Sequence, residues 1–347
     1  MAYTTVNKSS DYFNTKLYTG NGSTNAITGV GFQPDLLWFK NRTSAINHMW
    51  FDSVRGINKY FYGNLSEAEG TSSSVLTAVG SDGFTVGANN NVNGSSNGIA
   101  SWNWKAGTSF TNDASSTGIG SIDSVGSASN VSGFSIVSFT GTGSNGTIKH
   151  GLSTALSMVI IKRRDSSNDW RVGSDGLTNW TKHINLNTTA AESDLASAFN
   201  STAPTSSVFS VGTSPSTNAS GGTYIAYCFS SIKGYSKVGS YTGNGNADGP
   251  FVYTGFKPAF VLQKNASATQ GWQLQDNKRE GYNGDNDLLQ PHDSAAESGV
   301  NRIDILSNGF KVITTDAGQN SSGATYIYMA FAENPFVTSG GVPGLAE

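Results

Sequence analysis

The sequence predicts an all-β protein built from three tandem antiparallel β-sandwich modules of about 100 residues each. Composition is the first observation behind this prediction, because 42 of the 347 residues are glycine and only 13% are charged. Serine, threonine, asparagine and glycine take the place of charged residues, and they favour turns and sheet surfaces over helix interiors. The other observations are a threefold internal repeat and a series of short apolar segments without a helical period.

The repeat starts with a glycine-rich segment that occurs three times. Residues 18–22 (YTGNG) are matched by residues 241–245 (YTGNG) and more loosely by residues 139–143 (FTGTG). An apolar segment that ends in lysine follows each of them, at residues 31–40, 151–162 and 255–264. A tryptophan comes eight to ten positions after each lysine, as Trp50, Trp170 and Trp272. Blocks that recur in one order indicate three copies of one structural unit.

Each copy supplies the strands that a sandwich needs. The segments Leu36–Phe39, Met158–Ile161 and Phe260–Leu262 are short, apolar and partly β-branched, which predicts central strands covered on both faces. A turn and strand follow later in each copy, and an aromatic strand closes it. We expect the shared aromatic residues to form the core of each module, since each ring buries ~150–250 Å². They are Trp50, Trp170, Trp272, Phe84, Phe209, Phe310, Trp104, Phe229 and Phe331.

Two alternatives stay open at this point. A small barrel is the alternative architecture for each module, and a sugar-stacking platform is the alternative role for the shared aromatic residues. Residues 189–200 are the one segment whose apolar spacing suggests a helix.

The register of the repeat sets the expected boundaries. Module one covers residues 1–106, module two residues 131–234 and module three residues 235–336. Residues 107–130 are rich in Ser, Gly, Thr and Asn, which indicates a flexible linker or a long exposed loop. The glycine-rich segment of each copy predicts a tight hairpin turn, because Asn and Gly tolerate positive φ. Residues 337–347 are expected to form an extended C-terminal tail.

Charge and cysteine content exclude several classes of protein. The formal net charge is −3, so the chain offers no basic field for nucleic acid. Cys228 is the single cysteine, which excludes an intramolecular disulfide and a four-cysteine zinc site, and its apolar neighbours predict a buried side chain. No apolar stretch reaches 18 residues, so we expect no membrane insertion. Residues 1–11 lack the charged and apolar regions of a signal peptide, so no export signal is expected.

The titratable residues do not indicate catalysis. A glycosidase needs two carboxylates about 5–9.5 Å apart, but the acidic residues are sparse and the repeat pairs none of them. The four histidines lie in dissimilar contexts. His292-Asp293-Ser294 has the residue types of a hydrolase triad, but adjacency in sequence says nothing about geometry. We therefore expect no enzyme activity, no catalytic residue and no cofactor.

One segment holds oxygen ligands of the kind that calcium prefers. Asp285 and Asp287 lie there with the neighbouring Asn283 and Asn286. The segment lacks the glycine and the terminal Glu of an EF-hand loop, so we favour a solvated polar loop and expect no metal.

Aromatic residues outside the repeat are the candidates for ligand binding. They are Tyr60, Phe61 and Tyr62 in module one and Tyr282 in module three. Residues that the shared fold does not need are expected in loops, and loops carry binding on a rigid sandwich.

Two segments resemble virion proteins of tailed phages, particularly marine ones of the cyanophage type. One is Gly31–Arg42 (GFQPDLLWFKNR), and the other is the closing Tyr326–Phe336 (YIYMAFAENPF). The resemblance covers roughly Tyr12–Phe336, with module two the most diverged. It implies modules similar to concanavalin A-like or laminin-G-like sandwiches, of the jelly-roll or lectin-like kind. It also implies a structural role, and it carries over no catalytic residues.

The resemblance leads to three hypotheses about function. The first is a non-enzymatic tail-fibre or appendage component that presents lectin-like modules for host attachment. The second is a capsid decoration whose three modules imitate a trimer and bridge capsomers. The third and least favoured is a polysaccharide-degrading enzyme. The expected partners are other virion proteins, a host-surface glycan or protein, and further copies of the chain. The expected location is the virion, assembled in the host cytoplasm.

Overall fold

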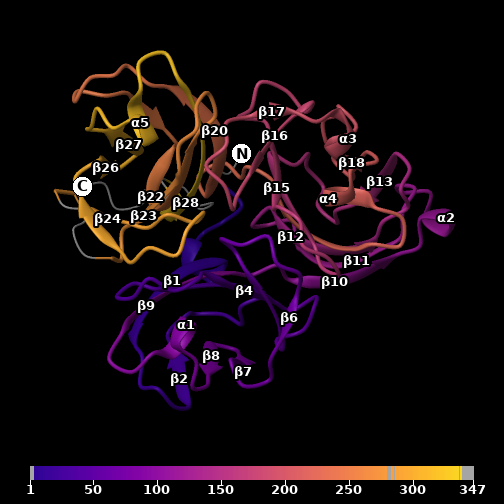
Figure 1. Cartoon of the computed structure of the whole chain (residues 1–347), viewed down its shortest axis with the longest axis horizontal. Helices are drawn as coiled ribbons and strands as arrows, with labels where there is room; N and C mark the ends of the chain where they lie inside the picture. Colours follow the sequence, from indigo (N-terminus) through magenta and orange to yellow (C-terminus); the bar gives the residue numbers. More distant parts are fainter. Residues whose placement is uncertain (1–3, 280–282, 285, 336, 338–347) are drawn as a thin grey trace.

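The computed structural model describes residues 4–279, 283–284, 286–335 and 337, and it confirms the all-β prediction. Three lobes surround a common centre, and each lobe corresponds to one copy of the repeat (Figure 1). We refer to residues 4–106 as module 1, to 107–234 as module 2 and to 235–335 as module 3. Each module is a sandwich of a large and a small antiparallel sheet.

Module 1 begins with the 3-10 helix η1 (Ser9–Asp11). Its large sheet has the strand order β1-β9-β3-β4-β5-β6. These strands are β1 (Phe13–Thr19), β9 (Gly98–Trp104), β3 (Leu36–Asn41), β4 (Met49–Asp52), β5 (Lys59–Tyr62) and β6 (Gly70–Thr71). The small sheet, in the order β2-β8-β7, contains β2 (Asn25–Thr28), β8 (Gly83–Val86) and β7 (Leu76–Gly80). Helix α1 (Asn90–Asn93) precedes the closing strand β9.

Module 2 repeats this plan with additions at one edge. Its large sheet has the order β10-β11-β12-β19-β14-β15-β16-β17, and β13 pairs with β18 in the small sheet. The large sheet contains β10 (Thr108–Asn112), β11 (Ser124–Ser129), β12 (Phe134–Thr140), β19 (Thr223–Phe229), β14 (Met158–Arg163), β15 (Arg171–Ser174), β16 (Lys182–Asn185) and β17 (Ser193–Asp194). The small sheet contains β13 (Gly146–Lys149) and β18 (Val208–Val211). The short helices are α2 (Ala114–Thr117), α3 (Ala196–Phe199) and α4 (Pro215–Asn218).

Module 3 has the large sheet β20-β28-β22-β23 and the small sheet β21-β27-β26. The large sheet contains β20 (Ser236–Thr242), β28 (Thr325–Pro335), β22 (Phe256–Asn265) and β23 (Trp272–Asp276). The small sheet contains β21 (Phe251–Tyr253), β27 (Gly309–Val312) and β26 (Ile303–Leu306). A separate pair consists of β24 (Asn286–Leu288) and β25 (Ser298–Val300), and helix α5 (Ala317–Asn320) precedes β28.

The large sheets are covered on both faces, and their two faces belong to different cores. One face packs on the small sheet of the same module, as Phe39, Phe51 and Phe84 do in module 1. The opposite face contributes to one central core that residues of all three modules share. Phe331 of module 3 lies 5.7 Å from Trp104 of module 1 and 6.1 Å from Phe229 of module 2, measured between ring centroids. The modules therefore form a ring about a pseudo-threefold axis.

Residues 107–130 correct the predicted boundaries, because they are not a linker. Strand β10 pairs with β11 and β11 pairs with β12, so the segment extends the large sheet of module 2. Helix α2 lies between β10 and β11 in the chain. The Asp113 carboxylate caps it by accepting a hydrogen bond from Ser116 N. Polar composition misled the prediction, since an edge strand exposed on one face carries many polar residues. The predicted tail, residues 337–347, lies outside the described residues apart from Val337.

The glycine-rich segments are also not hairpin turns. Strands β1 and β2 belong to different sheets, so Gly20–Gly22 joins the large sheet to the small one. A Cβ at Gly20 would lie 2.1 Å from the Gly94 carbonyl oxygen, and a Cβ at Gly243 would lie 2.3 Å from that of Ser321. The residues that follow helices α1 and α5 approach Gly20 and Gly243 too closely for a side chain, so both positions require glycine. The segment 189–200 contains the single-turn helix α3 in place of a longer helix.

Candidate functional site

The repeated lysines Lys40, Lys162 and Lys264 lie at the junctions between modules. Each side chain is fully buried and its ammonium donates to a backbone carbonyl of a neighbouring module. Lys162 reaches Ser66 O at 3.2 Å, Lys264 reaches Thr189 O at 3.2 Å and Lys40 reaches Ser294 O at 3.1 Å. Burial lowers the pKa of each lysine to about 8. The three contacts close the ring, since module 2 contacts module 1, module 3 contacts module 2 and module 1 contacts module 3.

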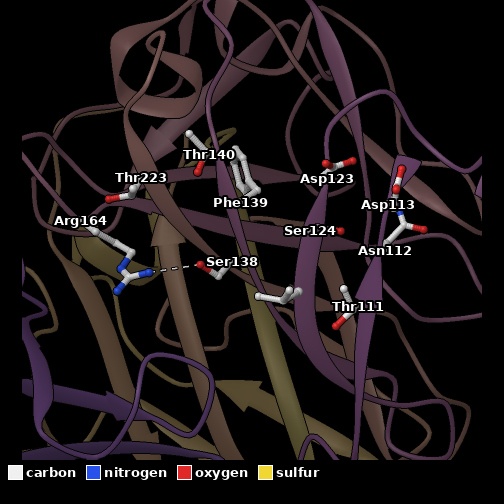
Figure 2. Close-up of a pocket in the computed structure, with 11 residues that line it drawn as sticks. Thr111, Asn112, Asp113, Asp123, Ser124, Ser138, Phe139, Thr140, Arg164 and Thr223 are labelled. Atoms are coloured by element: carbon white, nitrogen blue, oxygen red, sulfur yellow. Dashed lines mark hydrogen bonds between the residues drawn. The ribbon is translucent and has the colours of Figure 1, made fainter. Parts of the chain in front are cut away.

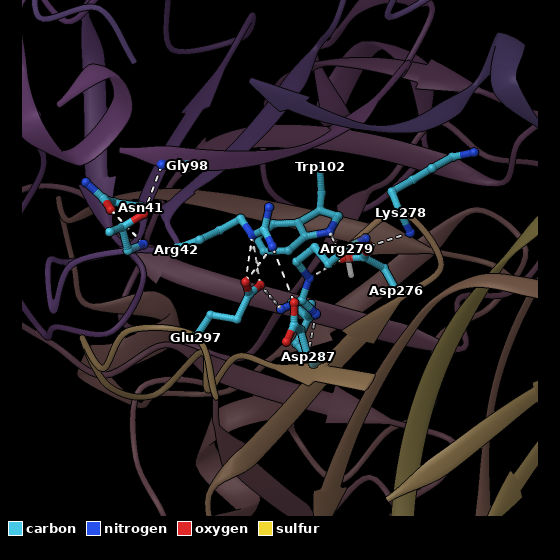
Figure 3. A network of polar contacts seen from close by, with 11 residues as sticks. Asn41, Arg42, Gly98, Trp102, Asp276, Lys278, Arg279, Asp287 and Glu297 are labelled. Carbon is cyan, nitrogen blue, oxygen red and sulfur yellow. Dashed lines mark hydrogen bonds and ion pairs between the residues drawn. The ribbon is translucent and has the colours of Figure 1, made fainter. Parts of the chain in front are cut away.

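The junction of modules 3 and 1 contains a buried ionic network (Figure 3). Arg279 Nε donates to Asp276 Oδ2 at 2.7 Å, and Trp102 Nε1 of module 1 donates to the same oxygen at 3.0 Å. Glu297 accepts from Arg279 Nη1 at 3.0 Å and from Arg42 Nε of module 1 at 2.8 Å. Burial alone would raise the pKa of Asp276, but the adjacent Arg279 guanidinium holds it below its ordinary value. The network is therefore charged and compensated within the junction.

The junction of modules 1 and 2 repeats that network at equivalent positions. Asp52 accepts from Arg55 and, at 2.8 Å, from the Tyr227 hydroxyl of module 2. Glu69 accepts from Arg55 Nη1 at 3.2 Å and from Arg164 Nε of module 2 at 2.9 Å. Burial raises the pKa of Tyr227 well above its ordinary value, so its hydroxyl stays a donor. Thus an aspartate, two arginines, a glutamate and one aromatic donor from the neighbouring module form each ionic junction.

The junction of modules 2 and 3 lacks the ionic cluster at the corresponding positions. The strand registers place Ser174 where the other modules have Asp52 and Asp276, and Met329 where they have Trp102 and Tyr227. Leu177 stands three residues after Ser174, in the position of Arg55 and Arg279. The backbone amide of Glu192 donates to the carbonyl of Ala266. In the other junctions the amides of Glu297 and Glu69 donate to the carbonyls of Arg42 and Arg164, so Ala266 stands in the position of an arginine. The Glu192 carboxylate binds Thr178 of its own module.

The registers also correct the alignment of the repeated tryptophans. Lys264 pairs with Trp272, and Trp170 stands the same eight positions after Lys162. Eight positions after Lys40 is His48, whereas Trp50 pairs with Trp38 and so corresponds to Val172 and Leu274. His48 is buried and its Nδ1 accepts from Trp38 Nε1 at 2.8 Å. Burial lowers its pKa well below the ordinary value, so the ring is neutral.

All nine aromatic residues of the repeat are buried, but they divide between two kinds of core. Those of the central core are Trp50, Trp170, Trp272, Trp104, Phe229 and Phe331. Those between the two sheets of one module are Phe84, Phe209 and Phe310. The sequence predicts that all nine pack within their own modules. The first set packs on residues of its own module and also on those of neighbouring modules, as in the contact of Trp50 with Trp170, so it joins the modules to one another.

The predicted loop aromatics of module 1 lie in a strand. Tyr60, Phe61 and Tyr62 belong to β5, and Phe61 is fully buried in the central core with its ring 5.3 Å from that of Trp170. Tyr60 and Tyr62 are half-buried against the core of module 1. The loop interpretation is wrong for these three residues, because β5 belongs to the large sheet. Tyr282 lies outside the described residues.

Of the two candidate calcium ligands, the structure describes Asp287. Asp285 lies outside the described residues. Asp287 Oδ2 lies 3.3 Å from Arg42 Nη2, beside Glu297. Burial and the nearby Glu297 raise the pKa of Asp287 to about 6. Among the described residues, no group of three His, Cys, Asp or Glu side chains is arranged to hold a metal ion.

A pocket of about 290 Å³ opens where β10 and β11 extend the sheet of module 2 (Figure 2). Arg164 lies on one side of it and Asp113 and Asp123 on the other. These groups already have partners, since Arg164 binds Glu69 and Ser138 while Asp123 accepts from Ala114 N at 2.8 Å. The pocket is open to solvent, and its charged groups are held by the fold.

Cys228 and three of the histidines are the remaining candidates for chemistry, and the structure places them as follows. Cys228 is buried, and burial raises the pKa of its thiol. Burial lowers the pKa of His150 and of His183 to about 4. The His292 ring lies 3.7 Å from Asp293, and the Ser294 carbonyl accepts from Lys40, so this segment contributes to a junction. In the part of the chain that the structure describes, no helix is long and apolar enough to cross a membrane.

Sequence reasoning missed the junction residues, although part of their signal was visible. The lysines recur in all three copies, and the Asp-x-x-Arg spacing of Asp52–Arg55 recurs as Asp276–Arg279. Repeated charged residues next to apolar strands indicate buried pairs, since an unpaired buried charge is costly. Nothing in the sequence pattern identifies the partner module.

The chain matches the model of a protein family. The family model described as "Domain of unknown function (DUF7483)" matches residues 8–335. No curated protein matches the chain. The matched region spans all three modules, in agreement with a ring whose modules share one core. Because the match covers nearly the whole chain, the protein belongs to the DUF7483 family.

Proposed function

We propose that the protein is a non-enzymatic structural component of a tailed-phage particle, on a tail fibre or other appendage, where it presents its modules for host attachment. The observation that carries the proposal is the ring itself. Three modules are joined by buried lysines and ionic networks, and their outer surfaces are left for contact with partners. A rigid scaffold that presents loops and small sheets is suited to binding.

The placement of the titratable groups supports a role without catalysis. Asp52 and Asp276 are buried and paired with arginines, and Glu69 and Glu297 each bridge two arginines. A general acid or base needs an accessible group within reach of a substrate. These carboxylates instead stabilise the junctions, because Asp52 and Asp276 are fully buried and Glu69 and Glu297 are each bound by two arginines.

Capsid decoration is the second candidate, and the pseudo-threefold arrangement is the observation that favours it. A monomer with three similar lobes around one axis can match three similar sites on a symmetric surface (Figure 1). In that role the modules would bridge neighbouring capsomers through protein–protein contacts.

Quantitative mass spectrometry of purified virions tests both candidates. A few dozen copies or fewer per particle are expected for a tail location, and hundreds for a capsid decoration. Immunogold labelling of the same particles gives an independent location. Absence of the chain from purified virions would refute both candidates. Release of reducing sugar from host polysaccharide, abolished by substitution of one carboxylate, would refute the non-enzymatic role.

A further inference from the structure

The outer face of the small sheet of module 3 exposes two aromatic side chains. Phe251 is 45% exposed and Tyr253 is 55% exposed, while Val252 between them is buried in the core of the module. Side chains alternate along a strand, so the two rings lie on the same face of β21. Leu306 on β26 is also exposed, at 37%. Gly309 lies opposite both Tyr253 and Leu306 in the sheet.

The other two modules show that the fold does not require these rings. Ile27 pairs with Phe84 and Ile148 pairs with Phe209, as Val252 pairs with Phe310. The residues on either side of these equivalent positions are Ala26 and Thr28 in module 1 and Thr147 and Lys149 in module 2. The same backbone position thus has small or polar side chains in two modules and exposed aromatic ones in the third. Packing does not account for the difference.

A groove of about 350 Å³ lies beside Tyr253, where module 3 follows module 2. Its lining includes the hydroxyl residues Ser231, Ser236 and Thr254 and the lysines Lys233 and Lys237. No Asp or Glu is among its described lining residues. Lys237 Nζ donates to the Tyr253 carbonyl at 2.6 Å and lies 5.4 Å from the centre of the Tyr253 ring. A lysine ammonium has three donors, so this position allows further hydrogen bonds to a ligand.

The size of the exposed patch distinguishes between possible occupants. Three side chains exposed by about half present roughly 300 Å² of apolar surface, given ~150–250 Å² for a large side chain. A stable protein interface buries about 800 Å² on each partner, so this patch is too small for one. A chain of sugar rings fits it better, because each ring offers an apolar C–H face to an aromatic ring and hydroxyls to polar side chains. The lysines favour a ligand with negative charge.

We propose that this face binds an acidic saccharide, with the rings of Phe251 and Tyr253 stacking on successive sugars and Lys237 contacting a carboxylate or sulfate of the chain. The proposal rests on the proposed function in host attachment and names the class of ligand. The outer faces of the equivalent sheets in modules 1 and 2 do not bind the saccharide, since they lack the aromatic pair.

Isothermal titration calorimetry on the full chain tests this assignment. The probes are a hexamer of galacturonic acid, a sulfated galactose hexamer and, as the neutral control, maltohexaose. The acidic hexamers are expected to bind at least ten times more tightly than maltohexaose, and the comparison of the two acidic probes distinguishes carboxylate from sulfate. Absence of binding to both acidic probes, or equal binding of maltohexaose, would overturn the proposal.

Two variants test whether Phe251, Tyr253 and Lys237 contact the saccharide. F251A/Y253T installs the residues that module 1 has at these positions, and it is expected to weaken binding at least tenfold. K237Q is expected to reduce the preference for acidic over neutral probes. The matched control T28A alters the equivalent face of module 1 and is expected to bind like the wild type. All side chains changed in F251A/Y253T point outward, and an unchanged melting temperature verifies the fold. Wild-type affinity of F251A/Y253T would refute the site.

Virions carrying F251A/Y253T separate this proposal from the proposed function. We expect the variant in particles at the wild-type copy number, with weaker adsorption to host cells. Normal incorporation and normal adsorption would refute the binding site while leaving the structural role intact. Absence of the wild-type chain from virions would refute the structural role, whatever the calorimetry gives.

Discussion

Two junctions of the ring are ionic and the third is apolar. The junctions of modules 1 and 2 and of modules 3 and 1 each bury an Asp–Arg pair with a bridging Glu. The junction of modules 2 and 3 has Ser174, Leu177 and Met329 at the corresponding positions. The lysine that reaches across to a carbonyl is common to all three.

The difference indicates that a junction can form without the ionic cluster when its charged members are replaced together. Removing one member of a buried ion pair leaves an uncompensated charge, whereas replacing the whole pair with apolar residues is often neutral. Four of the five members of the cluster differ together at the apolar junction: the aspartate, both arginines and the aromatic donor. The glutamate remains as Glu192, and it binds Thr178 of its own module. The shared central core and the lysines are therefore what every junction needs, and the ionic cluster is one of two ways to fill the space between them.

Separating module 3 from the rest after Gly234 is expected to have the largest effect. The cut would expose apolar faces of the large sheets, including Trp104, Phe229 and Phe331 of the central core. We expect residues 1–234 and 235–347 to aggregate or remain unfolded when expressed alone, because exposed patches of this size are unfavourable in water. Co-expressed fragments should re-form the ring, as measured by gel filtration and circular dichroism. A cooperative thermal transition of residues 1–234 alone would contradict a shared core.

Replacing Arg279 by leucine tests the ionic junction directly. The R279L variant leaves Asp276 buried without its partner and is expected to lose about 3–5 kcal/mol of unfolding free energy. The double variant D276S/R279L installs the pair of the apolar junction and should lose clearly less. Urea denaturation of both variants measures the difference. Equal losses would show that the junction does not depend on charge compensation.

Lys264 tests the feature that all junctions share, through pH. Burial lowers its pKa from 10.5 to about 8 in the folded protein. Between these pH values the unfolded chain binds more protons, so the contribution of Lys264 to stability rises from pH 8 to 10.5 and is lost as the pH falls through 8. A lowering of the pKa from 10.5 to about 8 corresponds to roughly 3.4 kcal/mol over the whole pH range. Denaturation at pH 8 and pH 10 should show a smaller rise for K264M than for the wild type.

The control for that measurement is the ionisation of buried tyrosines. Burial raises the pKa of Tyr227 and of Tyr241 well above 10, so their contribution to stability falls as the unfolded chain ionises above pH 10. Comparison at equal pH between wild type and K264M removes this effect. An identical pH response of the two proteins would contradict a lowered lysine pKa.

Glu192 should give the smallest effect. Its carboxylate binds Thr178 near the surface and no arginine across the junction, so E192A is expected to cost less than about 1 kcal/mol. E297A leaves Arg42 and the buried Arg279 without the bridging carboxylate and should cost several times more. Thermal denaturation of the two variants ranks the junctions. A larger loss for E192A would reverse the comparison.

Much of the fold could be predicted, because local patterns carry it. Leu36–Phe39 and Met158–Ile161 were recognised as central strands from continuous apolar runs, and the structure covers both faces of each. Residues 107–130 could not be recognised as strands, since their polar composition is shared by linkers and exposed edge strands. His48 was missed because a tryptophan two positions later resembled the repeat more closely.

The candidate sites were harder to predict than the fold. Tyr60, Phe61 and Tyr62 lie outside the repeat, which predicts a loop, yet they form strand β5. Phe61 packs against Trp170 of the neighbouring module, and Tyr60 and Tyr62 pack against the core of module 1. No sequence motif marks Phe251 and Tyr253. The structure shows that both are exposed, and the strand registers show that the equivalent positions of the other modules have small or polar residues.

The sequence by itself determined the all-β class, the three copies and the positions where glycine is required. These properties follow from residue type and local spacing. Tertiary structure alone decided which surface covers the second face of each large sheet. Hydrophobic burial is non-directional, so an apolar strand face indicates that it must be covered and does not say by what. Here the neighbouring modules cover it, so three sandwiches that follow one another in the sequence pack as one ring with a shared core.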